Sequence, residues 1–199
     1  MNITMKSLEE LLRLNKQIRV VGFDDAPFKM DRGSPVKIAG VICSNTRFEG
    51  LLWGEVSKDG DDATEVLSTL LRQSKFYDQI HVVLTDGIAV GGFNIIDLPA
   101  LAHSLQRPCI AVMRKQPDMV SIDNALRNFS DYTTRKRTLL QAGETYQRDN
   151  FYYQVAGSDS ETAAQVLERV TDCGHVPEAL RLAHLIGAGV MTGQSSNRA

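Results

Sequence analysis

Two carboxylates follow one another where a run of β-branched residues ends. Residues 18–25 read IRVVGFDD, and an Ala-Pro pair then breaks the predicted strand. Neighbouring side chains on a strand point to opposite faces, so Asp24 and Asp25 cannot both face the core. A carboxylate at a sheet end is costly to bury unless a cation or an arginine accompanies it. The pair is therefore a candidate metal site; the alternative is a turn cap beside a solvated aspartate.

A second predicted strand, residues 80–84, ends at Thr85-Asp86-Gly87. Ligands bind beyond the carboxyl ends of parallel strands, so Asp24 and Asp86 can meet if their strands are neighbours. Oxygen ligands without a Cys or His pair suit Mg²⁺ or Mn²⁺ better than zinc. Such an ion activates water and stabilises a leaving oxygen in phosphodiester cleavage. The alternative for Asp86-Gly87 is an ordinary turn after a strand.

Two basic segments differ in what they can do. Arg114 and Lys115 follow a strand predicted over residues 109–113, where a cation can hold phosphate near the acids. The second segment, residues 135–137, reads Arg-Lys-Arg within a helical stretch. That pattern favours a solvated helix face, with a face toward nucleic acid as the alternative.

A late helix carries three polar residues at spacing three: Glu178, Arg181 and His184. This spacing places them along one side of the helix. His184 is a candidate metal ligand or proton carrier, and Arg181 a candidate anchor for an acidic group. The alternatives are a packed or solvated histidine and a surface ion pair between Glu178 and Arg181.

The order of the predicted elements that position these residues changes along the chain, from consecutive strands to alternating strands and helices. Strands are predicted at residues 18–25, 36–43 and 48–56, and their short connections favour an antiparallel meander. A helix from residue 63 leads into alternating strands and helices, which indicates parallel crossovers. Further helices are predicted at 95–105, 119–126, 132–142, 161–170 and 178–188, with a strand at 151–155. The expected fold is α/β, a ribonuclease H-like mixed sheet flanked by helices.

Composition sets broad limits. The 199 residues predict a single domain over residues 1–199, with a lead-in helix within 1–15 and a frayed polar tail at 192–199. The formal charge of −2 argues against a surface built wholly for polyanions, although local basic patches can still bind nucleic acid. Three scattered cysteines favour a reduced intracellular protein, and no apolar run approaches the ~18 residues of a membrane span. A cytoplasmic location is expected.

Several long motifs carry a family resemblance. VVGFDDAPF, EGLLWGEV, DGDDATEVL, VVLTDGIAVGGFNIIDL, RPCIAVMRKQPD and GHVPEALRLAHLIGAGV resemble the archaeal family called domain of unknown function ninety-nine. The chain more distantly resembles endonuclease V, a ribonuclease H-like enzyme that cuts nucleic acid near deaminated bases using Mg²⁺. Its G-x-D pattern is similar to Gly22-Phe23-Asp24, and its D-G motif to Asp86-Gly87. Its P-x-I-x-V-x-K and P-E-P-x-R-x-A-D/H stretches are similar to residues 108–114 and 177–184.

The departures from endonuclease V concern lesion recognition. Its aromatic-Pro-Gly wedge has no counterpart in residues 48–52, where the chain reads FEGLL, and its H-P-R element is replaced at residues 89–94. Arg114 stands where a Lys is expected and, unlike Lys, cannot give up a proton. The nearest acid by order to the family's catalytic Glu is Asp61. Inosine-specific cleavage is therefore not expected, whereas a metal-binding acidic cleft is.

The leading hypothesis is a Mg²⁺- or Mn²⁺-dependent phosphodiesterase or nuclease acting on DNA or RNA. The resemblance implies Asp24 and Asp86 as primary ligands, Asp61 as a third and His184 as an outer ligand. Arg114, Lys115 and Arg181 would hold phosphate. The rival is a non-catalytic nucleic-acid or protein binding module on the same fold. A third, weaker alternative is an enzyme for small phosphorylated molecules that uses the same cleft.

Overall fold

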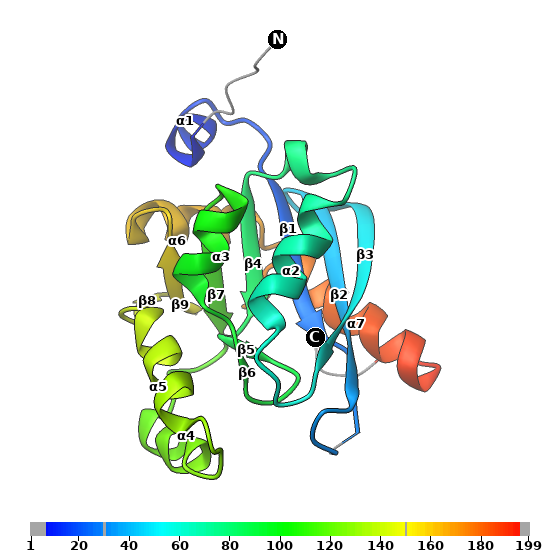
Figure 1. Cartoon of the computed structure of the whole chain (residues 1–199). Helices are drawn as coiled ribbons and strands as arrows, with labels where there is room; N and C mark the ends of the chain where they lie inside the picture. Colours follow the sequence, from blue (N-terminus) through cyan, green and yellow to red (C-terminus); the bar gives the residue numbers. More distant parts are fainter. Residues whose placement is uncertain (1–6, 30, 150, 196–199) are drawn as a thin grey trace.

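A seven-stranded sheet forms the centre of the computed structural model, which describes residues 7–29, 31–149 and 151–195 (Figure 1). The strand order is β3-β2-β1-β4-β7-β9-β8, and a separate two-stranded sheet pairs β5 with β6. The strands are β1 (Arg19–Asp25), β2 (Pro35–Ser44), β3 (Arg47–Ser57), β4 (Val82–Asp86), β5 (Ala89–Val90), β6 (Asn94–Ile95), β7 (Cys109–Met113), β8 (Tyr146–Arg148) and β9 (Phe151–Ala156).

The strand directions confirm the predicted mixed sheet. Strands β1, β2 and β3 form an antiparallel meander, whereas β1, β4 and β7 run parallel. Strands β9 and β8 complete the sheet in antiparallel pairing. Strands β5, β6 and β8 were not predicted, because elements of two or three residues are too short to show a hydrophobic period.

Helices cover both faces of the sheet (Figure 1). They are α1 (Leu8–Arg13), α2 (Ala63–Arg72), α3 (Leu98–Leu105), α4 (Met119–Leu126), α5 (Tyr132–Gln141), α6 (Ser160–Arg169) and α7 (Glu178–Thr192), with a 3-10 turn at Tyr77–Gln79. Helices α2 and α3 pack on one face, and α1, α6 and α7 on the other. The α4–α5 pair lies beyond the end of the sheet, near β5 and β6 (Figure 1).

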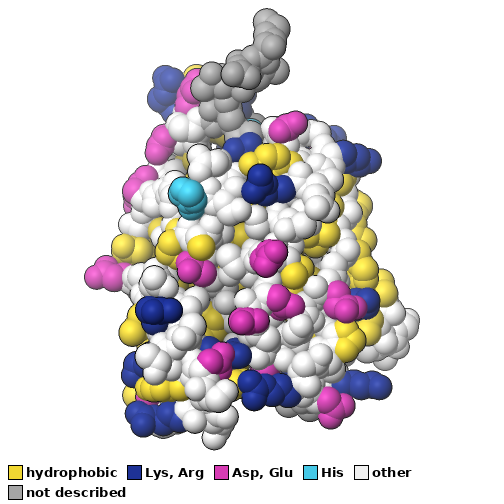
Figure 2. All heavy atoms as spheres, viewed as in Figure 1, with side chains coloured by type: hydrophobic (Ala, Val, Ile, Leu, Met, Phe, Trp, Pro, Cys, Tyr) yellow, Lys and Arg dark blue, Asp and Glu magenta, His cyan; other side chains and the backbone are white. Residues whose placement is uncertain are grey.

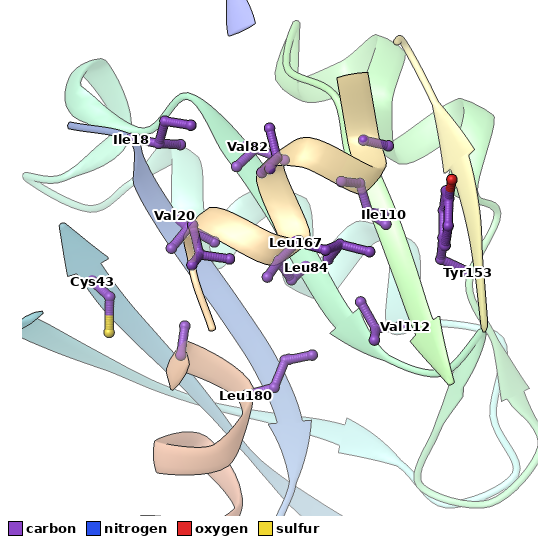
Figure 3. Close-up of a cluster of buried hydrophobic side chains, with 14 of the residues drawn as sticks. Ile18, Val20, Cys43, Val82, Leu84, Ile110, Val112, Tyr153, Leu167 and Leu180 are labelled. Atoms are coloured by element: carbon purple, nitrogen blue, oxygen red, sulfur yellow. The ribbon is translucent and has the colours of Figure 1, made fainter. Parts of the chain in front are cut away.

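Alternation along the strands divides the core into two layers. On one face, Val20, Leu84 and Val112 pack with Leu167 of α6 and Leu180 of α7 (Figure 3). The intervening residues of the same strands pack against α2 and α3. Residues two apart on a strand share a face. Asp24 and Asp86 therefore lie on the same face of the sheet as Val20 and Leu84, which is the face that α7 covers.

The ends of the chain agree with the predicted pattern where they are described. The hydroxyl of Ser7 accepts a hydrogen bond from the backbone N–H of Glu10 at 3.3 Å, which is half of a capping box at the start of the lead-in helix. Met5, expected in the same helix, lies outside the described residues, as do 196–199 of the predicted tail. Every helix in the described part of the chain is too short or too polar to cross a membrane.

Candidate metal centre

Asp24 and Asp86 end neighbouring parallel strands at the same level. The register of β1 and β4 pairs Phe23 with Thr85, so the next residue of each strand is one of the two acids. Both then fall on the face that α7 covers. Asp24 is only 6% exposed, and Asp86 is half-buried. The structure therefore brings together the two acids that the sequence singles out.

The electrostatics of this pair are unfavourable without a cation. The pKa of Asp24 is raised to about 8, chiefly by burial and also by the negative charges of Asp86 and Asp25, against smaller opposing effects that include Arg114. Burial also raises the pKa of Asp86, while Arg114 and His184 act in the opposite direction. A divalent cation would remove the repulsion that keeps one carboxyl protonated.

His184 reaches Asp24 because α7 packs very closely on β1. Its Nδ1 atom lies 3.0 Å from Oδ2 of Asp24. A Cβ on Gly22 would lie 2.8 Å from the backbone of Ala179, a distance that side chains do not tolerate. A Cβ on Gly187 would lie 3.1 Å from Ala26. Small residues on both elements therefore set the helix position that brings histidine and aspartate together.

The three predicted phosphate-binding residues occupy different surroundings. Arg114 is exposed after β7, and its charge lowers the pKa of both Asp24 and Asp86. Lys115 is also exposed, and its charge acts on the helix-capping Asp118 instead. Arg181 forms a two-point ion pair with Glu178, at 2.7 and 2.8 Å. Of the three, Arg114 is the cation that acts on the acidic pair.

Asp61 lies apart from the pair, and Asp25 takes the neighbouring position. Asp61 is exposed just before α2 and forms no metal-holding group with Asp24 and Asp86. Asp25 Oδ2 accepts a hydrogen bond from Gly91 N at 2.6 Å, and Gly91 O accepts one from Asp59 N at 2.8 Å. Burial raises the pKa of Asp25, the hydrogen bond from Gly91 lowers it, and the charge of Asp86 raises it again. The alternation of side chains along a strand predicts that Asp25 points away from Asp24, but it does not predict that Gly91 is the hydrogen-bond partner of Asp25.

Two carboxylates are enough for the way in which proteins usually bind Mg²⁺, because a complete set of protein ligands is not required. Over residues 7–29, 31–149 and 151–195, no three His, Cys, Asp or Glu side chains are grouped closely enough to hold a metal ion. Mg²⁺ usually keeps several waters and is bound through one or two carboxylates together with phosphate oxygens. The pairing of Asp24 with Asp86 fits that pattern, with substrate oxygens completing the shell.

The segment matched to the endonuclease V wedge is far from this centre. Strand β2 pairs Ser44 with both Arg19, at the start of β1, and Arg47, at the start of β3. Phe48 therefore lies at the opposite end of the sheet from Asp24. It is 50% exposed, so this aromatic side chain does not pack in the core. Trp53, on the same strand, is partly buried against the core.

Arg135 corrects the prediction of a solvated basic face on α5. It is 6% exposed, and its guanidinium donates hydrogen bonds to the carbonyls of Asp59, Gly60 and Phe93 at 2.6–3.0 Å. It also lies over the ring of Phe129. Arg135 thus ties α5 to the two loops that flank the Gly91 turn. These contacts span more than 40 residues of sequence, which local charge patterns cannot reveal.

Sequence comparisons connect this chain with known proteins. The model of a family described as endonuclease dU matches residues 16–191. A UPF0215 protein of Methanothermobacter thermautotrophicus is 36% identical over 192 residues, covering 94% of each chain. One of Pyrococcus horikoshii is 38% identical over 188 residues, covering 92% of this chain and 97% of the relative. The predicted resemblance to an archaeal family is confirmed.

Solved structures show the same architecture. A protein of unknown function from Archaeoglobus fulgidus has a TM-score of 0.83 at 32% identity, with 88% of this chain and 99% of that one covered. Human endonuclease V has a TM-score of 0.57 at 15% identity, covering 94% and 90%. Endonuclease V of Ciona intestinalis, bound to DNA containing an inosine followed by a ribo-adenosine, has a TM-score of 0.55 at 15% identity, covering 88% and 90%. The fold is endonuclease V-like, which confirms the ribonuclease H-like prediction.

Proposed function

The chain belongs to the endonuclease dU family, and from this premise we propose that it is a cation-dependent nuclease that cuts DNA at deoxyuridine. One observation carries the proposal: a buried and a half-buried carboxylate end neighbouring parallel strands at the same level, with a histidine and an arginine beside them. Such a group binds a hard cation and a phosphodiester at once. The name of the family indicates the nucleotide at which the strand is cut, deoxyuridine, and the chemistry of the site indicates the type of reaction, phosphodiester cleavage.

Each residue has a role that follows from its surroundings. Asp24 and Asp86 hold Mg²⁺ or Mn²⁺, which when bound supplies water activation and charge stabilisation at the phosphate. Arg114 binds the phosphate oxygens, because its charge already acts on both acids from the exposed side. His184 orients Asp24 through Nδ1 and is of the side-chain type that exchanges protons near neutral pH.

DNA is the proposed partner, since a structural relative is bound to DNA. Lys and Arg side chains lie over α4 and α5 in Figure 2, although acidic side chains are interspersed with them on this face. Arg127 and Lys136 both pair with Asp123, which leaves this region with a modest positive charge. Electrostatic attraction of this size makes binding dependent on salt concentration.

An incision assay tests the proposal. Single- and double-stranded oligonucleotides carry one deoxyuridine, one inosine or neither, and are incubated with Mg²⁺ or Mn²⁺. We expect cleavage of the deoxyuridine strand only with cation present, and its loss in Asp24→Asn and Asp86→Asn. The matched control is Asp78→Asn, an exposed acid in the 3-10 turn at the opposite end of the sheet. Absence of cleavage with every substrate and both cations, or full activity of Asp24→Asn, refutes the proposal.

The alternative function is a binding module without catalysis. It is favoured by the lack of a three-ligand group over the described part of the chain. Mn²⁺ that binds only the folded state raises the unfolding temperature by mass action. Stabilisation by Mn²⁺ that disappears in Asp86→Asn supports the nuclease. Nucleic-acid binding that is unchanged by a chelator, together with no Mn²⁺ stabilisation, supports the module.

A further inference from the structure

The loop that follows Asp86 is fixed at two strand ends. Its first anchor is the backbone N–H of Gly87, which donates to the carbonyl of Val112 in β7 at 2.7 Å. Its second anchor is the backbone N–H of Gly91, which donates to the Asp25 carboxylate of β1 at 2.6 Å. The loop therefore spans the carboxyl end of β4, with a tether on either side of it.

The far side of the same turn is held by a second carboxylate. Asp59 donates its backbone N–H to Gly91 O and accepts a hydrogen bond from Phe93 N at 2.9 Å. Gly92 has φ +89°, and a Cβ there would lie 2.4 Å from Oδ1 of Asp59. Only glycine satisfies both conditions. The turn is thus clamped between two aspartates, and Asp25 is the one that also adjoins the cation site.

We propose that Asp25 is a positioning residue for the cation site, acting through Gly91 to hold Asp86 beside Asp24. Its side chain leaves β1 on the face opposite Asp24, and one oxygen is committed to Gly91 N. The property that matters is a hydrogen-bond acceptor, not a negative charge. Groups that hold metal ligands in place typically contribute 10- to 100-fold in metal affinity. This inference rests on the proposed cation site.

Titration of the full chain with Mn²⁺, followed by the electron paramagnetic resonance signal of the free ion, tests the inference without an activity assay. Asp25→Asn keeps an oxygen that can accept from Gly91 N, so its affinity should stay within about threefold of wild type. Asp25→Ala removes the acceptor, so its affinity should fall on the order of 10- to 100-fold. The control is Asp78→Ala, at the opposite end of the sheet, which should match wild type.

Hydrogen exchange at the Gly91 amide provides the structural readout. Protection should persist in Asp25→Asn and be lost in Asp25→Ala. Loss of Mn²⁺ affinity in Asp25→Asn overturns the inference, because Asp25 would then act through its charge; this variant decides the question even if Asp25→Ala does not fold. Unchanged affinity in Asp25→Ala overturns it as well. If wild type itself binds no Mn²⁺, the cation site is refuted and the inference with it, a result distinct from the other two.

Discussion

Replacing Asp24 with asparagine removes the titratable group at this site while nearly keeping the shape of the side chain, so it tests how much the buried carboxyl group affects folding stability. The side chain is buried, and its pKa is raised from 3.8 to about 8 in the folded protein. Between these two values the folded state holds a proton that the unfolded state releases. Folding stability must therefore fall as pH rises from about 4 to about 8. Asparagine has nearly the same shape and does not titrate, so Asp24→Asn should lack this pH dependence.

The size of the effect follows from linkage. One group that differs in protonation between the two states changes stability by about 1.4 kcal/mol per pH unit, or about 3 kcal/mol between pH 5 and 7. For a chain of 199 residues, 1 kcal/mol corresponds to about 2–4 °C in unfolding temperature. The unfolding temperature of Asp24→Asn should therefore rise relative to wild type by about 6–12 °C over these two pH units.

The assay is thermal unfolding by circular dichroism at pH 5, 6, 7 and 8 in a chelator, with Asp78→Asn as the exposed control. Repeating the series with Mn²⁺ should stabilise wild type most at the higher pH values, because the cation and the proton compete for the same carboxylate. Asp24→Asn should respond weakly to Mn²⁺ at every pH. Unfolding curves of wild type and Asp24→Asn that shift in parallel from pH 5 to 8 would refute the reasoning.

Two further predictions concern the elements that position the site. Gly22→Ala should destabilise the fold by about 1–3 kcal/mol in urea unfolding, because its Cβ meets the α7 backbone at 2.8 Å. Gly189→Ala, in the same helix with no atom within 4 Å, should be neutral or slightly stabilising, and equal losses in both would contradict the packing argument. Arg135→Ala should cost about 3 kcal/mol by leaving three carbonyls without their donor, whereas the exposed Arg137→Ala should leave urea unfolding unchanged. Similar midpoints for the two arginine variants would argue against the buried hydrogen bonds.

Local patterns are enough to predict the longer strands and the acidic pair. Hydrophobic runs mark β1, β4 and β7, and an acid or a basic residue follows each run. Parallel strands place their carboxyl ends at one edge, so the order of elements already implies that Asp24, Asp86 and Arg114 lie near one another. The Asp25 alternation argument is of the same kind, because it needs only the two-residue period of a strand.

Tertiary contacts between distant segments are not predictable in this way. Arg135 belongs to a basic run that resembles a solvated face, yet it is buried against carbonyls 42 to 76 positions away. Asp61 is close to the expected acid by chain order but forms no metal-holding group with Asp24 and Asp86, and the segment that adjoins the site through Asp25 is instead the β5–β6 turn. Each strand of that turn has only two residues, which is too short to show a hydrophobic period. The turn is held in place by the contact between Asp59 and Gly92, and no periodic pattern in the sequence predicts that contact.

Gly22 links the predictable part of the site to the unpredictable part. The sequence marks it only as part of a G-x-D pattern, and the distance of 160 residues between Asp24 and His184 gives no sign of their contact. The structure supplies the reason for the glycine: α7 lies so close to β1 that no side chain fits, and this approach delivers the histidine to the aspartate. The position of the glycine, two residues before the acid, follows from strand alternation, because both must face the helix. A short motif on one strand therefore reflects the packing of a helix from the other end of the chain.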